Sequence, residues 1–259
     1  MPVWQRDDTE AVVCCVCHRE GRPIYDLDPF GVVRCPRCGL VFVSPRLRPD
    51  ALQRLYDAPE YHGRVYGGNA DFLQRQWTKG RLALATRETR RPLQGARLLE
   101  IGAGHGSFLD AARTAGYDVT GVELSVTAAE HARTALGLTI HSTQLEDAPL
   151  EGRFDVVCAW DTIEHVPDPV QFWAAVRQVV ADDGVVLFST PYFSSLPSRL
   201  LRQRWWTLKP TEHIWQFTPT THRTAAAVAG MRVTRTIRNP LSSVNVARLD
   251  SLVGVARPE

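Results

Sequence analysis

The chain has 259 residues, of which 30 are Lys or Arg, 28 are Asp or Glu, and 44% are hydrophobic. A chain of this length and composition can bury a substantial core as one domain or two small ones. The formal net charge of +2 excludes a strongly cationic nucleic-acid binder of the histone type, although it allows a local basic face. No stretch reaches about 18 consecutive apolar residues, and the N-terminus MPVWQRDDTE lacks the apolar core of a secretory signal. We therefore expect a cytoplasmic protein without a transmembrane segment.

Most of the cysteines lie close to the N-terminus, and four of them form two Cys-x-x-Cys pairs. This spacing is typical of a zinc site in which each pair directs two thiolates at one ion. The predicted ligands are Cys14, Cys17, Cys35 and Cys38. Because four cysteines leave no coordination position open to a substrate, the predicted site is structural. Two alternatives stay open: Cys15 could replace Cys14 as a ligand, or the cysteines could be free buried thiols.

The first half of the chain divides into two expected segments. Residues 1–45 form the predicted zinc-binding module, which ends in the apolar run LVFVSP. Residues 46–95 form a helical connector and lid, because apolar residues recur there at helical spacing. The intervening stretch EYHGRVYGGN is polar, aromatic and glycine-rich, which favours a loop. Its Tyr61, His62 and Tyr66 could close over a bound ligand or simply serve as packing groups.

From residue 96 onward, strand and helix patterns alternate. Strands are expected at 96–102, 118–124, 138–142, 154–160, 184–191, 231–237 and 251–256. Helices are expected at 106–115, 126–136, 168–181 and 218–229, the last beginning at a Thr-Pro pair. Such alternation predicts parallel βαβ units and an α/β doubly wound sheet.

The first expected strand ends in a glycine-rich turn, in which Glu100 precedes Gly102, Gly104 and Gly106. Three glycines allow a tight strand-to-helix turn and a close approach of the backbone to a ligand at the carboxyl edge of the sheet. Glu123 ends the second strand, where a carboxylate can accept hydrogen bonds from both hydroxyls of a ribose. The turn therefore predicts a nucleotide-cofactor site.

Two nucleotide cofactors fit this geometry. A nicotinamide cofactor normally uses the spacing G-x-G-x-x-G, with its pyrophosphate at the helix N-terminus. This chain instead has G-x-G-x-G preceded by Glu100, and an acid there would repel a pyrophosphate but attract the ammonium of a methionine moiety. The residues therefore favour S-adenosylmethionine.

Three segments then carry a family resemblance. LLEIGAGHGSFL, VTGVELS and FDVVCAWDTIEHVPDP resemble the class I S-adenosylmethionine-dependent methyltransferases, over roughly residues 96–237. The branch is the one with the ubiquinone-biosynthesis O-methyltransferases and the zinc-containing sugar C-methyltransferases. CPRCGLVFVSPR also resembles the zinc module that precedes many bacterial members. The resemblance implies a Rossmann-like seven-stranded sheet whose last strand is antiparallel, a small N-terminal zinc ribbon, and a catalytic domain over 96–259 with an acceptor-side insert at 192–217.

The resemblance also implies which residues hold the cofactor. The three glycines would cradle the methionine part beside Glu100, and Glu123 would hold the ribose. Leu145 and Glu146 would flank the adenine, although STQLEDA lacks the glycine that often precedes the family's acidic residue. Asp161, just after the fourth strand, is also assigned to the cofactor pocket.

Methyl transfer requires an aligned acceptor and, for a hydroxyl or an acidic C–H, a group that takes the proton. The first candidate group is Asp161, Glu164 and His165, which by resemblance could hold a divalent ion or could be purely architectural, with His165 as a catalytic candidate. The second is Glu212 and His213 in the insert, where the sugar C-methyltransferases place a Glu-His pair with histidine as the proposed base. The alternative is that this pair only shapes the lid. The tyrosine expected two residues before the glutamate is replaced by Pro210.

The insert also contains SRLLRQRWWTLKP, in which arginines surround two tryptophans. It could grip a phosphorylated acceptor, touch a membrane surface to collect a lipid-linked one, or be a solvated face with tryptophans packed beneath. We predict methyl transfer to O, or to C, of a small-molecule acceptor such as a sugar, a secondary metabolite or a lipid-linked intermediate. An RNA methyltransferase is the alternative, although the near-zero net charge argues against nucleic acid, and a non-catalytic scaffold is the third possibility. A second subunit in a homodimer could complete the acceptor site.

Overall fold

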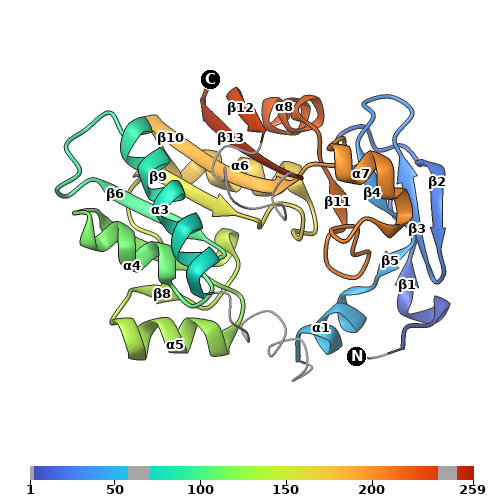
Figure 1. The fold of residues 1–259 in the computed structure, drawn as a ribbon, viewed down its shortest axis with the longest axis horizontal. Coiled ribbons are helices and arrows are strands. Elements are labelled where there is room, and N and C mark those ends of the chain that lie inside the picture. The colour runs from blue at the N-terminus through green and yellow to red at the C-terminus, as the bar shows by residue number, and fades with distance from the viewer. Residues whose placement is uncertain (1–2, 58–70, 239–249) are drawn as a thin grey trace.

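The computed structural model describes residues 3–57, 71–238 and 250–259, and it places a large sheet beside a smaller antiparallel one (Figure 1). The predicted loop residues Tyr61, His62 and Tyr66 lie outside the described residues. The large sheet has seven strands in the order β12–β13–β10–β9–β6–β7–β8. They are β6 Arg97–Ile101, β7 Asp118–Val122, β8 Ile140–His141, β9 Phe154–Trp160, β10 Val180–Pro191, β12 Met231–Arg238 and β13 Ser251–Pro258.

Within this described sheet β13 runs antiparallel to both of its neighbours, β10 and β12, and every other pairing is parallel. Chain order reverses at β6, because β7 lies on one side of it and β9 on the other. In open α/β sheets, ligands bind outside the carboxyl ends of the strands at such a switch point. The predicted α/β sheet with an antiparallel last strand is therefore confirmed, and its topology places the glycine turn where a ligand would bind.

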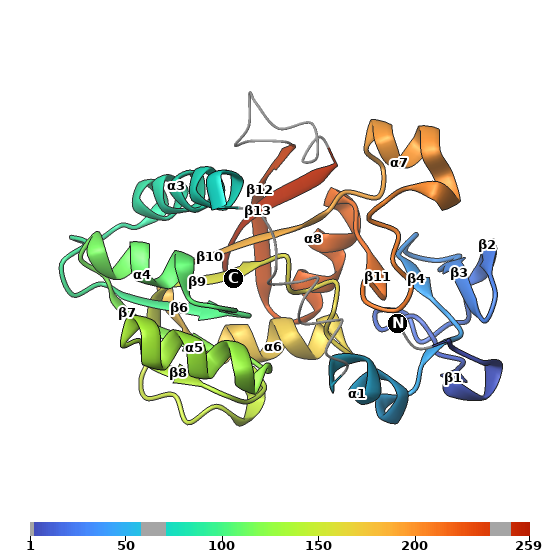
Figure 2. The ribbon, with the colours of Figure 1, turned by 60° about the horizontal axis from the view of Figure 1, so that its bottom comes forward.

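Helices cover both faces of the sheet, because consecutive residues of buried strands point to opposite sides. On β6, Leu98 belongs to the core beneath α3, α4 and α5, whereas Leu99 belongs to the core beneath α6 and α8. Figure 2 shows α3, α4 and α5 at the β6–β7–β8 end and α8 beside β12 and β13. The helix bounds are α3 Asp71–Glu88, α4 Ser107–Thr114, α5 Val126–Leu136, α6 Pro169–Val179 and α8 Pro219–Val228.

Several helix ends follow the local sequence signals. Thr218 caps α8, with Pro219 in the first turn, and its hydroxyl accepts a hydrogen bond from the Thr221 N–H at 3.2 Å. One expected boundary is wrong: the helix predicted over 168–181 ends at Val179 instead of at residue 181. Val180 instead begins β10 and pairs with Phe154, where its side chain is fully buried. The spacing of Val180 fits a helix, but burial of its β-branched side chain in the sheet favours the strand.

The smaller sheet joins the N-terminal segment to the insert. Its strands run in the order β11–β4–β3–β2, and a two-stranded pair, β1 with β5, lies beside it. These strands are β1 Thr9–Glu10, β2 Arg22–Leu27, β3 Phe30–Arg34, β4 Val41–Val43, β5 Arg46–Leu47 and β11 Trp215–Gln216. Thus residues 215–216 of the predicted insert complete the sheet of the predicted zinc module. The remaining described elements are η1 Arg6–Asp8, α1 Pro49–Asp57, η2 Leu145–Asp147, α7 Leu196–Leu201 and η3 Arg202–Arg204.

Candidate functional site

The glycine turn lies between β6 and α4 at the carboxyl edge of the large sheet. Gly102, Gly104 and Gly106 have φ angles of +74°, +53° and +82°, which L-residues rarely adopt. A Cβ atom added to Gly102 would lie 2.6 Å from Thr162 Oγ1, so a side chain does not fit there. Gly106 is the N-cap of α4. The turn thus exposes backbone rather than side chains to a ligand.

Two carboxyl groups flank this turn, one half-buried and one fully buried. Glu123, just past β7, accepts hydrogen bonds from the N–H groups of Gly104 at 2.7 Å and Ser125 at 2.8 Å. Glu100, on β6, is buried, and its Oε2 has no hydrogen-bond partner within the described part of the chain. Burial raises the pKa of both carboxyl groups, and at Glu100 the nearby Arg81 cation opposes the increase. Glu100 thus offers a buried acceptor for a cationic ligand group.

Arg81 is a site residue that the sequence analysis missed. It extends from α3, the connector helix, and its Nη2 donates a hydrogen bond of 2.6 Å to Asp161 Oδ2. Its guanidinium lies over the Trp160 ring, with the carbon 5.0 Å from the ring centroid. A buried arginine reaching the carboxyl edge from another element offers a fixed donor for a carboxylate. The available signal was one arginine in the otherwise apolar run RLALA.

Asp161 is held in a strained conformation at the end of β9. Its φ is +53°, its N–H donates to the Ser189 carbonyl at 2.9 Å, and its Oδ1 accepts from the Ser189 hydroxyl at 2.9 Å. Non-glycine residues in this region are uncommon and often occur at functional sites. In this conformation the Asp161 carboxylate accepts hydrogen bonds from both Ser189 and Arg81.

Three further side chains meet next to this edge. Potential ligand atoms of Glu164, His165 and His213 all lie within 4.8 Å of one another. The imidazole centroids of His165 and His213 are 4.8 Å apart in an edge-to-face arrangement. The sequence analysis left Asp161, Glu164 and His165 as either ligands of a divalent ion or architectural residues, but the compact group has His213 in place of Asp161. Asp161 pairs with Arg81 instead, whereas the insert brings in His213, which lies two residues before β11.

The His213 imidazole has a defined tautomer. Its Nδ1 lies 2.7 Å from the Thr207 carbonyl oxygen, which can only accept, so Nδ1 carries the proton and the neutral ring leaves Nε2 unprotonated. Burial lowers the pKa of His213 to about 4 and that of His165 to about 3, so both rings are neutral at neutral pH. Glu212 is buried beside them, 3.8 Å from Lys209 Nζ.

The adenine-side candidates lie on η2. Leu145 is buried in the core and Glu146 is exposed.

The two tryptophans of the arginine–tryptophan segment differ in exposure. Trp205 is buried, and its Nε1 donates to Asp250 Oδ2 at 2.7 Å. Trp206, by contrast, is 47% exposed.

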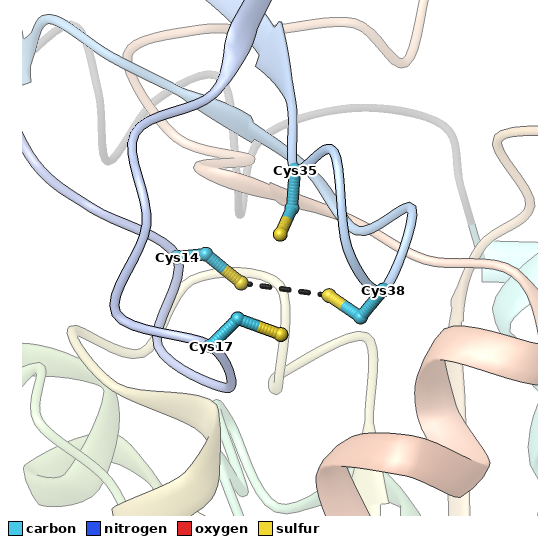
Figure 3. A group of neighbouring side chains, drawn as sticks. All are labelled: Cys14, Cys17, Cys35 and Cys38. Carbon is cyan, nitrogen blue, oxygen red and sulfur yellow. Dashed lines mark hydrogen bonds between the residues drawn. The ribbon is translucent and has the colours of Figure 1, made fainter.

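The four predicted zinc ligands converge on one point, as Figure 3 shows. Their sulfur atoms lie within 4.8 Å of one another, and those of Cys14 and Cys38 are 3.6 Å apart. Two thiolates on a tetrahedral zinc, with bonds of about 2.3 Å, lie about 3.8 Å apart. Gly39, directly after the second pair, has a φ of +77°. The cluster therefore fits a zinc ion.

Cys15 does not belong to this cluster. It is buried, and burial together with the nearby Asp168 carboxylate raises its pKa to about 12. Its sulfur is not among the four that lie within 4.8 Å of one another. Of the two adjacent cysteines, Cys14 is therefore the one placed for zinc.

Comparisons with known proteins agree with this geometry. A protein-family model described as a methyltransferase domain matches residues 70–236, more than half of the chain. The chain belongs to this methyltransferase family. Together with its fold, the match makes it a class I S-adenosylmethionine-dependent methyltransferase.

Curated relatives match over the middle of the chain. The ubiquinone biosynthesis O-methyltransferase of Thiobacillus denitrificans is 37% identical over 110 residues, which are 40% of this chain and 47% of that protein. The enzyme of the same name from Methylococcus capsulatus is 38% identical over 106 residues, or 38% of this chain and 44% of that protein. The chain thus spans about half the length of the curated relatives it matches.

Solved structures share the fold. The magnesium protoporphyrin IX methyltransferase from Synechocystis, with bound SAH, superposes with a TM-score of 0.61 at 18% identity, covering 82% of this chain and 100% of that one. An S-adenosylmethionine-dependent methyltransferase from Mesorhizobium loti gives 0.55 at 21% identity, covering 70% and 99%. These likenesses establish the architecture.

Proposed function

We propose that this methyltransferase transfers a methyl group to an oxygen, or to a carbon, of a small-molecule acceptor bound beside His213. The proposal rests on the position of His213, a neutral and buried histidine that lies against Glu164 and His165 in the segment following β9. When bound, S-adenosylmethionine supplies an electrophilic methyl carbon on its sulfonium. The ubiquinone-pathway relatives are named O-methyltransferases, which supports oxygen as the acceptor atom.

The buried groups around the turn support the cofactor assignment. The unpartnered Oε2 of Glu100 would accept from the methionine ammonium, and Arg81 would donate to the methionine carboxylate. Glu123 would accept the ribose hydroxyls, the three glycines would line the methionine part, and Leu145 with Glu146 would flank the adenine.

His213 would act as the general base. Its unprotonated Nε2 can take the proton from an acceptor hydroxyl, while Thr207 holds Nδ1–H and fixes the ring. The imidazolium formed would be stabilised by the Asp161 carboxylate, whose charge raises the pKa of His213 against the effect of burial. His165 and Glu212 would orient the base and the acceptor.

The test is a comparison of His213→Ala with the unmodified enzyme. We expect the variant to keep its affinity for S-adenosylhomocysteine, measured by calorimetry. We also expect it to stop forming S-adenosylhomocysteine from S-adenosylmethionine when phenolic, sugar-nucleotide or isoprenoid-linked hydroxyl acceptors are supplied. Unchanged turnover would remove His213 from the mechanism. Failure of the unmodified chain to bind the cofactor product would overturn the assignment as an enzyme.

A specific surface favours a lipid-linked acceptor over a freely diffusing one. On and after α7, Leu196, Leu200 and Trp206 are 68%, 72% and 47% exposed, among the exposed side chains of Arg199, Arg202 and Arg204. Apolar side chains ringed by arginines suit the surface of an anionic bilayer. No helix in the described ranges has the length and hydropathy to cross a membrane, so the contact would be peripheral.

Vesicle sedimentation tests this second part. We expect binding to phosphatidylglycerol vesicles that is weakened by salt, absent with phosphatidylcholine alone, and lost in Leu196→Ser/Leu200→Ser. The matched control is Val3→Ser/Val228→Ser, which removes apolar groups of similar exposure elsewhere. Equal binding by both double variants would exclude this surface and leave a soluble acceptor.

A further inference from the structure

The segment after β9 carries Glu164 and His165, and its backbone is held from outside the large sheet. Three of its carbonyl oxygens accept hydrogen bonds from the smaller sheets: Glu164 from the Trp215 N–H at 3.2 Å, Val166 from Trp215 Nε1 at 2.8 Å, and Pro167 from Arg46 Nη1 at 3.1 Å. Three contacts on four consecutive residues restrain a connecting segment that otherwise depends on local turns. The holding groups come from β11 and β5.

Trp215 is itself fixed by β4. It pairs with Phe42 in the antiparallel register of β11 and β4, and the two rings are 5.5 Å apart. The Ile214 carbonyl accepts from the Val43 N–H at 2.9 Å, so the pairing extends to the residue next to His213. The Arg46 guanidinium lies 5.9 Å from the centroid of the Trp215 ring, joining both holding groups into one unit.

The cysteine cluster closes the turn that leads into β4. Cys35 directly follows β3, Cys38 lies three residues later, and the Cys35 N–H donates to the Leu40 carbonyl at 2.8 Å just before β4 begins. A metal held by both cysteine pairs would fix this turn, because structural zinc contributes directly to local folding. A chain of contacts therefore runs from the cysteines through β4 and β11 to His165.

We infer that Trp215 and Arg46 are positioning residues, through which the four-cysteine module sets the backbone of residues 164–167 and holds His165 against His213. The inference deepens the proposed function and rests on it for its catalytic meaning. It gives the module a task in methyl transfer that needs no contact with substrate or cofactor.

Hydrogen exchange read by mass spectrometry tests the positioning directly. In Trp215→Phe the ring and backbone pairing remain, but the hydrogen bond to Val166 is lost. One bond of ordinary strength corresponds to about a 2- to 10-fold change in an opening equilibrium. We expect exchange of amides 162–168 to rise by that factor in Trp215→Phe and in Arg46→Gln, with Arg46→Lys restoring part of the protection.

The matched controls are Trp206→Phe and Arg204→Gln, which change exposed residues of the same insert. They should leave exchange at 162–168 unchanged. S-adenosylhomocysteine affinity should stay within about twofold in every variant, because the glycine turn is untouched. Carbethoxylation by diethyl pyrocarbonate, mapped by mass spectrometry, should modify His213 faster in Trp215→Phe than in Trp206→Phe.

Metal removal tests the link to the cysteines. Treating the purified protein with a zinc chelator should raise exchange at 162–168 while S-adenosylhomocysteine still binds. Unchanged exchange at 162–168 in Trp215→Phe, or a rise spread evenly over the whole domain, would overturn the inference. A localised rise in a protein whose unmodified form fails to bind S-adenosylhomocysteine would instead uphold the positioning and refute the proposed function.

Discussion

Replacing Gly102 by alanine should damage the cofactor turn in two separable ways. The backbone φ of +74° disfavours any side chain, and the added Cβ would approach Thr162 to 2.6 Å at Oγ1 and 3.2 Å at Cγ2. Thr162 cannot turn away freely, because its hydroxyl donates to the Ile101 carbonyl at 3.1 Å. Gly95 offers a matched control, since its φ is +79° and nothing lies within 4 Å of its added Cβ.

The structure sets the size of each effect. A left-handed conformation costs about 1–2 kcal/mol for an L-residue. Steric overpacking adds about 1–3 kcal/mol when neighbouring groups must shift. Gly95→Ala should therefore lower the free energy of unfolding by about 1–2 kcal/mol, and Gly102→Ala by about 2–5 kcal/mol. The difference between the two variants measures the contact with Thr162.

Urea unfolding measures the stabilities, and calorimetry with S-adenosylhomocysteine measures the site. Gly95→Ala should keep its affinity for S-adenosylhomocysteine, whereas Gly102→Ala should weaken it at least about tenfold. A tenfold loss requires only that about 1.4 kcal/mol of the added strain be present in the bound state. Thr162→Ala in the Gly102→Ala background should recover part of the stability by opening space for the Cβ. Equal destabilisation by the two alanines, or no recovery in the double variant, would refute this steric reading of the turn.

Three further outcomes are expected. Glu123→Ala should lower S-adenosylmethionine affinity by about tenfold or more in calorimetry, because the Gly104 N–H loses its acceptor and the ribose loses its partner. Replacing the exposed Glu146 by alanine should have a smaller effect. Burial lowers the pKa of His213 to about 4, so its neutral form persists below the pH at which an ordinary histidine becomes protonated. The value of kcat/KM should therefore stay constant from pH 8 to pH 6 and decline only at lower pH. A decline of kcat/KM centred near pH 6.5 would contradict a buried base. Elemental analysis should find one zinc per chain, lost in Cys35→Ser and retained in His213→Ala; loss in the histidine variant would instead place a metal at the Glu164 group.

Much of the large sheet could be predicted because its signals are local. Buried strands such as FDVVCAW, the glycine turn, and caps such as Thr218-Pro219 depend on neighbouring residues, so the element order and the cysteine cluster follow from the sequence. Val180 shows the limit even for such signals. Its spacing continues a helix, but its pairing with Phe154 depends on β9, the strand on the other side of α6 in the sequence.

The candidate acceptor site depends on pairings that no local pattern encodes. Arg81 reaches Asp161 across 80 positions of the chain, and β11 joins β4 although most of the large sheet lies between the two strands in the sequence. Each strand of that pair is only two or three residues long, too short to carry a periodic signal of its own. Yet this pairing decides that His213, rather than Asp161, meets Glu164 and His165. The four-cysteine segment and the insert look like separate additions in the sequence, but they share one sheet. That sheet places His213 beside Glu164 and His165.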